Sequence, residues 1–281
     1  MAGMPENEVS AIVTDPPYGL EFSTKELDEG SSNKAHRHAQ FSRSGSGLPR
    51  YGSWAPTASK KGIESLLKQR KLLQSWHEKW LKEAYRVLKP GGWLLAFAST
   101  TTHHRLAVAA ENRGFEVRDL VVWLQGQGWP KSQASLRPNI EPVLVARKPF
   151  SEYGVKANKA KWGVGDLNRD FCRSEIERTP SNVVLGEDAQ VALGEKAAFF
   201  YTAKVGKKEK TGHPTQKPVA IFTYLLSLIA SPEDAKDHSI LDPFCGSGTC
   251  GVAAARLGFQ WQGIDQDARW TKITQERLQG E

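Results

Sequence analysis

Cysteine is scarce in this sequence, and the features of several other protein classes are missing as well. The 281 residues include three cysteines, Cys172, Cys245 and Cys250, which gives no disulfide framework and is typical of a reducing compartment. No apolar run approaches the ~20 residues of a membrane span, and no signal-peptide pattern opens the sequence. The histidines, including the pair His103 and His104, show no metal-ligand spacing. We therefore expect a cytoplasmic protein with no membrane span and no metal.

Basic residues are plentiful but unevenly distributed. The formal net charge is +7, with 39% hydrophobic and 25% charged residues. This is an ordinary globular composition, and the length suits one large domain or a domain with an insertion. Between residues 31 and 90, 13 Lys or Arg face three acidic residues, a surplus of 10. That surplus exceeds the value for the whole chain, so the positive charge is concentrated in one region.

The first half of this basic region predicts a mobile loop over about residues 21–61, because it is rich in Ser, Gly, Arg and His and has no apolar period. The loop also carries three aromatic residues, Phe41, Tyr51 and Trp54. A flexible cationic loop with aromatic side chains suits a polyanion with stackable bases. The alternative interpretation of the basic residues is a solvated helix face. The combination of positive charge and aromatic residues in one loop favours nucleic-acid binding. The DNA-binding candidates are Arg37, Arg43 and Arg50.

Hydrophobic patterns predict strands that alternate with helices. Apolar residues at three- and four-residue spacing predict a helix over residues 63–88, which the sequence LKPGG should end. The continuous apolar run at 93–100 predicts a strand buried on both faces. Further strands are expected at 12–14, 115–124, 141–149 and 238–242, the second and third as a candidate hairpin. Further helices are expected at 101–113, from Pro218 onward and at 249–257. The alternation indicates an α/β doubly wound sheet.

A short polar motif follows the first predicted strand, where the sequence reads AIVTDPPYGLEF over residues 11–22. Two prolines end a strand, because neither can donate a hydrogen bond to a ladder. A simple turn would account for Asp15 and one proline, but it does not require Tyr18. The motif is therefore either a turn or a site.

A glycine-rich turn lies near the other end of the chain, in ILDPFCGSGTCGVAAARLGFQWQGIDQD over residues 240–267. Glycines let the backbone approach a ligand closely, and the start of the following helix supplies free N–H groups and a positive dipole end. Asp265 ends the next predicted strand, where an acid can accept both hydroxyls of a ribose. The turn also matches G-x-G-x-x-G, which raises a dinucleotide-binding dehydrogenase as a rival interpretation.

The position of the turn decides against the dehydrogenase. A dinucleotide fold places this turn first, whereas here only 30 residues follow Gly251. The remaining strands must come earlier in the chain, so the sheet is circularly permuted. The strand before Asp15 can then lie beside the strand that ends at Asp242. Ligands bind at the carboxyl ends of strands near such a switch point, so we interpret the two motifs as one site.

Together the motifs resemble those of the amino-group DNA methyltransferases that use S-adenosylmethionine, in the permuted order with the catalytic motif first. Asp15-Pro16-Pro17-Tyr18 matches the family's D-P-P-Y motif. Residues 242–249 match its D-P-F-x-G-S-G-T cofactor loop, and residues 213–218 match its H-P-T-x-K-P element. The segments LVVWLQGQGWPKS and FFYTAKVGKKE also resemble the branch common in bacteriophages and prophages. The resemblance implies a Rossmann-like methyltransferase sheet with a small insertion for target recognition, of the kind found in restriction-modification.

The resemblance also implies roles for individual residues. Asp15 and the carbonyl of Pro16 would accept the two N–H groups of an exocyclic amino group, and the prolines, Pro17 included, would fix that carbonyl. Tyr18 would offer a face to the flipped base, and Asp265 would take the ribose hydroxyls of S-adenosylmethionine. The other cofactor-binding candidates are Asp242, Pro243, Phe244, Gly246, Ser247, Gly248, Thr249, Thr215 and Lys217. For Lys217 a solvated surface lysine is the alternative.

Three regions follow from this resemblance. Residues 1–149 would form the catalytic half with the basic loop, and residues 201–281 the cofactor-binding half. Residues 150–200 lack clear periodicity and would be the insertion, a candidate for target recognition. Family members usually carry one more strand before the catalytic motif, with a G-D-C-type segment that helps to hold the cofactor's adenine. This sequence begins after that segment, so we expect either a shortened chain or another contact for the adenine.

Adenine N6 is the expected target, because in the family an Asp at the first motif position goes mostly with adenine and a Ser mostly with cytosine. Cytosine N4 methylation is one alternative, and a non-catalytic DNA-binding protein that keeps the fold is another. Cytosine C5 methylation requires a cysteine nucleophile, which that family carries directly after a proline, and no Pro-Cys pair occurs in the sequence. We expect double-stranded DNA as the partner and a monomer or homodimer as the active form.

Overall fold

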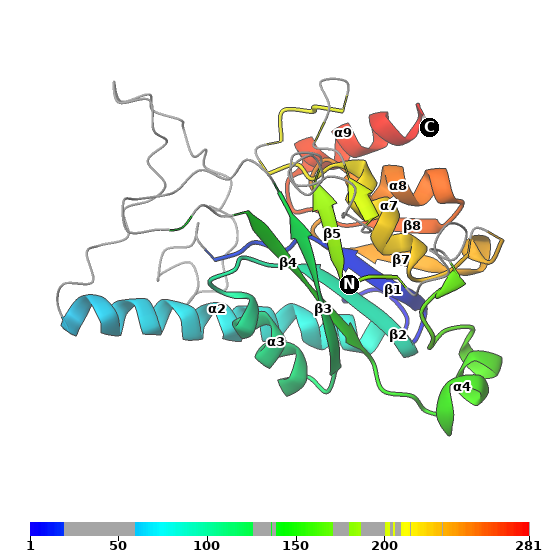
Figure 1. Cartoon of the computed structure of the whole chain (residues 1–281), viewed down its shortest axis with the longest axis horizontal. Coiled ribbons are helices and arrows are strands. Elements are labelled where there is room, and N and C mark those ends of the chain that lie inside the picture. The colour runs from blue at the N-terminus through cyan, green and yellow to red at the C-terminus, as the bar shows by residue number, and fades with distance from the viewer. Residues whose placement is uncertain are drawn as a thin grey trace.

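The computed structural model describes most of the chain, and Figure 1 shows it as a whole. The described residues are 1–19, 60–125, 136, 139–170, 180–186, 200–202, 205, 209–213, 215–231 and 233–280. Three predicted DNA contacts, at Arg37, Arg43 and Arg50, lie outside this part of the chain, as does nearly all of the predicted basic loop.

The described residues form one eight-stranded sheet in the order β6-β5-β3-β4-β2-β1-β7-β8. The strands are β1 (Val9–Thr14), β2 (Leu88–Phe97), β3 (Glu116–Leu124), β4 (Ile140–Arg147), β5 (Val183–Gly186), β6 (Phe200–Thr202), β7 (Ser239–Asp242) and β8 (Gln260–Gly263). Only β4 among these strands runs antiparallel to its neighbours, and all other pairings are parallel. The prediction of a doubly wound, permuted α/β sheet is confirmed.

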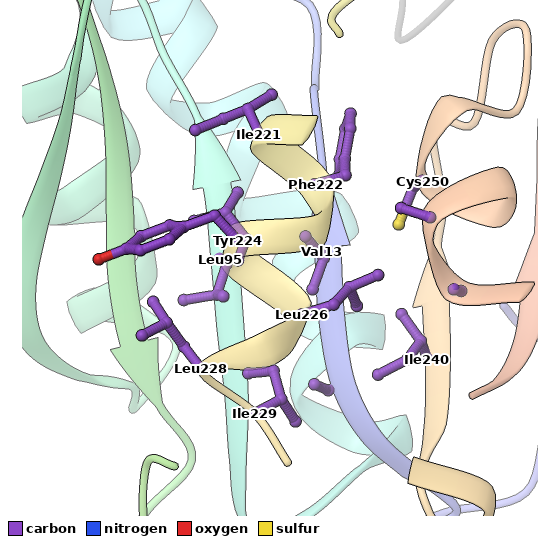
Figure 2. Packing of buried hydrophobic residues seen from close by; sticks show 14 of the residues in the cluster. Val13, Leu95, Ile221, Phe222, Tyr224, Leu226, Leu228, Ile229, Ile240 and Cys250 are labelled. Atoms are coloured by element: carbon purple, nitrogen blue, oxygen red, sulfur yellow. The ribbon is translucent and has the colours of Figure 1, made fainter. Parts of the chain in front are cut away.

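Helices cover both faces of the sheet, in three layers (Figure 1). The helices among the described residues are α2 (Lys60–Val87), α3 (His103–Asn112), α4 (Gly154–Trp162), α7 (Val219–Ser227), α8 (Thr249–Leu257) and α9 (Ala268–Leu278). Successive strand residues point to opposite faces. Val13 and Leu95 therefore pack with α7 and α8 (Figure 2), whereas Ile12 and Leu94 pack with α2 and α3.

The pairing of β1 with β7 is the permuted contact that the two motifs predict. Ala11 pairs with Ile240 and Ile12 with Leu241 in parallel register. The carboxyl ends of the two strands therefore meet at one edge of the sheet. The expected hairpin is confirmed as well, since β3 and β4 pair antiparallel along their whole length.

The boundary between α2 and β2 differs from the prediction. The sequence LKPGG does not form a loop after the helix, because α2 ends at Val87 and β2 begins at Leu88. The ladder with β1 is irregular between Val9 and Ala11, which is the kind of place where a strand accepts a proline. Gly91 has a φ of +83° there, a conformation that favours glycine. The strand also ends at Phe97 rather than at residue 100.

The described residues of the predicted insertion lie in two different places in the fold. Helix α4 lies at the amino end of β2, where Asn158 Nδ2 donates to the carbonyl of Pro90 at 2.9 Å. Strands β5 and β6 instead extend the sheet beside β3. Because β5 is parallel to β3, it ends at the same edge as β1. A role of residues 150–200 in target recognition stays a prediction, and α4 lies at the opposite edge.

Candidate functional site

The two predicted motifs lie next to each other at the carboxyl ends of β1 and β7. Thr14, the last residue of β1, donates its hydroxyl to Asp242 Oδ1 at 2.7 Å. Asp15 follows directly, and its side chain is 19% exposed. The structure therefore brings the D-P-P-Y motif and the glycine-rich turn into one site, as the permuted topology predicts.

Both carboxylate oxygens of Asp15 accept hydrogen bonds. The hydroxyl of Tyr18 donates to Oδ1 at 2.8 Å, and the ammonium of Lys217 donates to Oδ2 at 2.7 Å. Burial raises the pKa of Tyr18 well above its usual value, and the charge of Asp15 raises it further. The phenol therefore stays protonated and acts as a donor. The hydroxyl of Thr102 donates to the carbonyl of Tyr18 at 3.3 Å and anchors the end of the motif.

Lys217 lies beside Asp15 and is almost fully buried, so the solvated alternative does not hold. Its side chain is 8% exposed, and its ammonium also lies 3.3 Å from Glu141 Oε2. Burial lowers the pKa of Lys217, but the opposing effects of Asp15, Tyr18 and Glu141 are larger and leave it well above the usual value. Lys217 is therefore a buried cation that contacts the D-P-P-Y motif. The predicted role of Lys217 in cofactor binding does not require this position.

Glu141 and Gln125 are part of the site, although neither is identified by the sequence motifs. Glu141 stands near the start of β4, and the antiparallel direction of β4 brings that end to the edge that carries Asp15. Its Oε2 lies 3.4 Å from the hydroxyl of Tyr18. Its Oε1 accepts a hydrogen bond of 2.6 Å from Gln125 Nε2 at the end of β3. The local sequence signal for Glu141 is an acid before a proline at the start of a hairpin strand. The place of Glu141 in the site follows only from the direction of that strand.

Asp242 stabilises the glycine-rich turn through its side-chain hydrogen bonds. It is 2% exposed, and its Oδ1 also accepts the backbone N–H of Phe244 at 3.2 Å. Burial raises the pKa of Asp242 to about 7, even though the hydrogen bonds from Thr14 and Phe244 lower it. In this structure Asp242 therefore holds the turn against β1.

The glycines of the turn are needed for its shape. Gly246 has a φ of +48° and Gly248 a φ of +76°, values that L-residues with a side chain rarely adopt. A Cβ atom at Gly248 would also lie 2.5 Å from Thr274 Cγ2 of α9. Helix α8 then begins at Thr249 and ends before Gly258, as predicted. The first N–H groups of a helix have no partner within the helix, and those of α8 follow directly after the turn.

Asp265 lies just beyond the end of β8 and holds the turn from the other side. The predicted strand is slightly too long, because β8 ends at Gly263. Asp265 Oδ2 accepts the N–H of Gly246 at 2.9 Å, and Oδ1 accepts the N–H of Asp267 at 2.9 Å. Each carboxylate oxygen has a second lone pair. A contact with ribose hydroxyls is compatible with this geometry and stays a prediction.

The H-P-T-x-K-P element joins the two halves of the site. The ring of His213 packs edge-on against Trp270 at a centroid distance of 4.5 Å and lies over Gly246. Gln216 accepts from the N–H of Thr211 at 3.0 Å, which folds the segment back on itself. Thr215 is exposed, and Pro214 lies outside the described residues. The same short segment thus covers the glycine-rich turn and delivers Lys217 to Asp15.

Aromatic residues of α2 pack against the Phe244 ring, a contact that the sequence does not reveal. The ring of Trp76 lies 5.6 Å and that of Trp80 5.4 Å from the ring of Phe244. His77 is buried beside them and accepts the indole N–H of Trp80 at 3.1 Å. Burial lowers the pKa of His77 to about 3, so this histidine is neutral. Helix α2 therefore fixes one side of the turn.

The chemistry of the donor set fits a ligand with an amino-acid end and a ribose. The free N–H groups at the start of α8 suit a carboxylate, and Asp265 suits two hydroxyls. Within the ranges that the structure describes, no group of three His, Cys, Asp or Glu could hold a metal ion. Among those same residues, no helix is long and apolar enough to cross a membrane.

Comparison with known sequences gives matches along nearly the whole chain. A family model described as DNA methylase, of N6 and N4 methyltransferases, matches residues 9–276. Type II methyltransferase M.HindIII of Haemophilus influenzae is 28% identical over 304 residues, which cover 97% of this chain and 89% of the relative. Type II methyltransferase M2.DpnII of Streptococcus pneumoniae is 30% identical over 210 residues, which cover 73% of this chain and 67% of the relative.

Comparison with solved structures supports the fold. The M1.HpyAVI–SAM complex has a TM-score of 0.55 at 20% identity, covering 97% of this chain and 90% of the other. PvuII DNA methyltransferase (cytosine-N4-specific) has a TM-score of 0.58 at 14% identity, covering 100% and 89%. Identities this low show a shared fold alone. The match of the family model from residue 9 to residue 276 shows more, and by it the chain belongs to the N6/N4 DNA methylase family.

Proposed function

We propose that this protein is an S-adenosylmethionine-dependent DNA methyltransferase that methylates the exocyclic amino group of a flipped base, adenine N6. The observation that carries the proposal is the hydrogen bond of 2.7 Å between Thr14 and Asp242. It joins the strand before the D-P-P-Y motif to the strand before the glycine-rich turn. Asp15, which can accept N–H groups, therefore lies at the same edge of the sheet as the glycine-rich turn. That turn suits a nucleoside-containing ligand.

Asp15 and Pro16 perform the positioning in this proposal. An exocyclic amino group is a poor nucleophile, because its lone pair is delocalised into the ring. The carboxylate of Asp15 accepts one N–H and the carbonyl of Pro16 the other, so that the lone pair points at the methyl carbon. Pro16 is buried, and with Pro17 it restricts the backbone that carries this carbonyl. Tyr18 has the Lys217 ammonium 5.3 Å from its ring centroid, so the base would use the other face of the ring.

The glycine-rich turn is the proposed cofactor site. S-adenosylmethionine, when bound, supplies an electrophilic methyl group on its sulfonium. The N–H groups at the start of α8 would hold its carboxylate, and Asp265 its ribose hydroxyls. The residues proposed to line this site are Asp242, Pro243, Phe244, Gly246, Ser247, Gly248, Thr249 and Thr215. Lys217 is assigned instead to the D-P-P-Y site, because its ammonium lies 2.7 Å from Asp15.

Adenine is preferred over cytosine on three grounds. The family tendency links an Asp at the first motif position, here Asp15, mostly with adenine. A purine also overlaps a tyrosine ring more extensively than a pyrimidine does, and an A·T pair has one hydrogen bond fewer to break during flipping. The same acceptors could serve cytosine N4, and a structural neighbour is named as cytosine-N4-specific. Cytosine N4 methylation is therefore the second candidate function.

DNA contacts are proposed for the basic segment between β1 and α2. β1 ends at the edge of the sheet that carries Asp15, and the crossover begins there. Arg37, Arg43 and Arg50 are the proposed phosphate contacts. The relatives' names place them among Type II methyltransferases, and we propose the same restriction-modification setting and double-stranded DNA as the partner.

The test is methyl transfer to unmethylated DNA with purified protein and S-adenosylmethionine, followed by digestion to nucleosides and mass spectrometry. N6-methyldeoxyadenosine is the expected product. N4-methyldeoxycytidine would support the second candidate. A protein that binds DNA and S-adenosylmethionine but produces no methylated nucleoside would be a non-catalytic member of the family, and the proposal would be wrong.

A further inference from the structure

The proposed reaction needs an acceptor on Asp15 that other groups already use. Tyr18 donates to Oδ1 at 2.8 Å and Lys217 donates to Oδ2 at 2.7 Å. Each oxygen has a second lone pair, so an incoming amino group would share the carboxylate with these two donors and weaken their hydrogen bonds. A buried donor that loses its acceptor destabilises the site, and a charged donor does so more strongly. Without a second acceptor, this destabilisation would oppose binding of the target amino group to Asp15.

Glu141 is a second acceptor within reach of both donors. Its Oε2 lies 3.3 Å from the ammonium of Lys217 and 3.4 Å from the hydroxyl of Tyr18. Both distances are longer than the corresponding contacts with Asp15, so Glu141 is the weaker partner in the structure as it stands. A shift of a few tenths of an ångström would turn either contact into a full hydrogen bond.

The position of Glu141 is held independently of Asp15. Gln125 Nε2 donates to Glu141 Oε1 at 2.6 Å, and the backbone N–H of Gln125 donates to the carbonyl of Asn139 at 2.7 Å. These contacts join the ends of β3 and β4 and leave Oε2 of Glu141 facing the D-P-P-Y motif. The carboxylate is 28% exposed, so its placement beside Asp15 does not require full desolvation of the side chain.

We propose that Glu141 is a positioning residue for the proposed reaction. It receives the Lys217 ammonium and the Tyr18 hydroxyl when the amino group of the target base binds Asp15. No proton changes place in this exchange, because two carboxylates share one ammonium before and after it. Glu141 thereby makes Asp15 available as an acceptor at low cost. The inference rests on the proposed function and adds to it a residue outside the known motifs.

The first test is Glu141→Gln, which keeps the size of the side chain and removes its charge. We expect kcat for methyl transfer to fall at least tenfold. The KM for S-adenosylmethionine and the melting temperature should change little, because Glu141 is not part of the proposed cofactor site. Such a split separates a role in the reaction from a structural role. Gln125→Ala is a second variant, and it should lower kcat in the same direction by a smaller factor.

The matched control is Glu116→Gln on the same hairpin. Glu116 pairs with Arg147 at 2.6 Å, at the opposite end of β3 and β4. It is a carboxylate in an ion pair on the same two strands but remote from Asp15. We expect this variant to keep the kcat of the parent within about twofold, in line with the small effect of partly exposed ion pairs.

A double-mutant cycle with Lys217→Met provides the decisive comparison. Removing Lys217 removes the charged donor that Glu141 receives, so the loss from Glu141→Gln should be at least threefold smaller in that background. Equal losses in both backgrounds, or a Glu141→Gln variant with the kcat of the parent, would overturn the inference and leave the proposed function intact. A parent protein that transfers no methyl group to DNA would overturn the proposed function, and this inference with it.

Discussion

Asp242→Asn should change how the stability of the protein depends on pH. Burial raises the pKa of Asp242 from 3.8 to about 7 in the folded chain, whereas the unfolded chain keeps the ordinary value. Between these two values the folded state holds a proton that the unfolded state has lost. The free energy of unfolding therefore falls as the pH rises through this window, and above the window this group adds no further slope.

The magnitude follows from the width of the window. A shift of roughly three pKa units at about 1.4 kcal/mol per unit gives about 4 kcal/mol in total. Asparagine cannot ionise, and its side-chain oxygen can still accept from Thr14 and Phe244, which both donate to Asp242 Oδ1. Between pH 5 and pH 7 the variant should therefore gain roughly 2–3 kcal/mol relative to the parent.

Urea denaturation of parent and variant at several pH values between 5 and 8.5 would measure this difference. Asp237→Asn is the matched control, because Asp237 is an exposed carboxylate in the turn before β7. The control should follow the parent at every pH. If the Asp242→Asn variant also ran parallel to the parent, then Asp242 would not be protonated in the folded state, and this account of the turn would be wrong.

Three further predictions concern the proposed roles. Asp15→Ala should abolish methyl transfer and leave affinity for S-adenosylmethionine largely intact; turnover within tenfold of the parent would contradict its role. Asp265→Ala should weaken cofactor binding by roughly 1–3 kcal/mol through loss of a charged acceptor; calorimetry that finds unchanged affinity would remove Asp265 from the site. Joint neutralisation of Arg37, Arg43 and Arg50 should flatten the slope of log affinity for DNA against log salt by about 0.9 per lost phosphate contact; an unchanged slope would mean that these residues do not contact DNA.

Much of the fold follows from local patterns and one topological argument. The helix at 249–257 agrees with the prediction at both ends, because a glycine with positive φ stands on each side of it. The strand before Asp15 and the strand after His238 are predicted to be neighbours, because the glycine-rich turn comes late in the chain. Local chemistry and chain order were sufficient for these features.

Other features depend on contacts that no local pattern contains. Lys217 resembles a surface lysine in sequence, and only the long-range approach of its segment to Asp15 makes it a buried cation. Glu141 reaches the same site because β4 runs antiparallel, a direction that periodicity cannot reveal. Gly91 belongs to a strand because the irregular ladder with β1 accommodates the LKPGG sequence. In each case the tertiary partner decides, and local propensity does not.

The central claim is that this chain transfers a methyl group from S-adenosylmethionine to an exocyclic amino group in DNA. The most direct measurement is mass spectrometry of nucleosides from unmethylated double-stranded DNA after incubation with the purified protein. Parent protein and the Asp15→Ala variant would be compared under identical conditions. We predict N6-methyldeoxyadenosine with the parent and none with the variant. No methylated nucleoside with the parent, or 5-methyldeoxycytidine as the product, would contradict the account, whereas N4-methyldeoxycytidine would correct only the identity of the base.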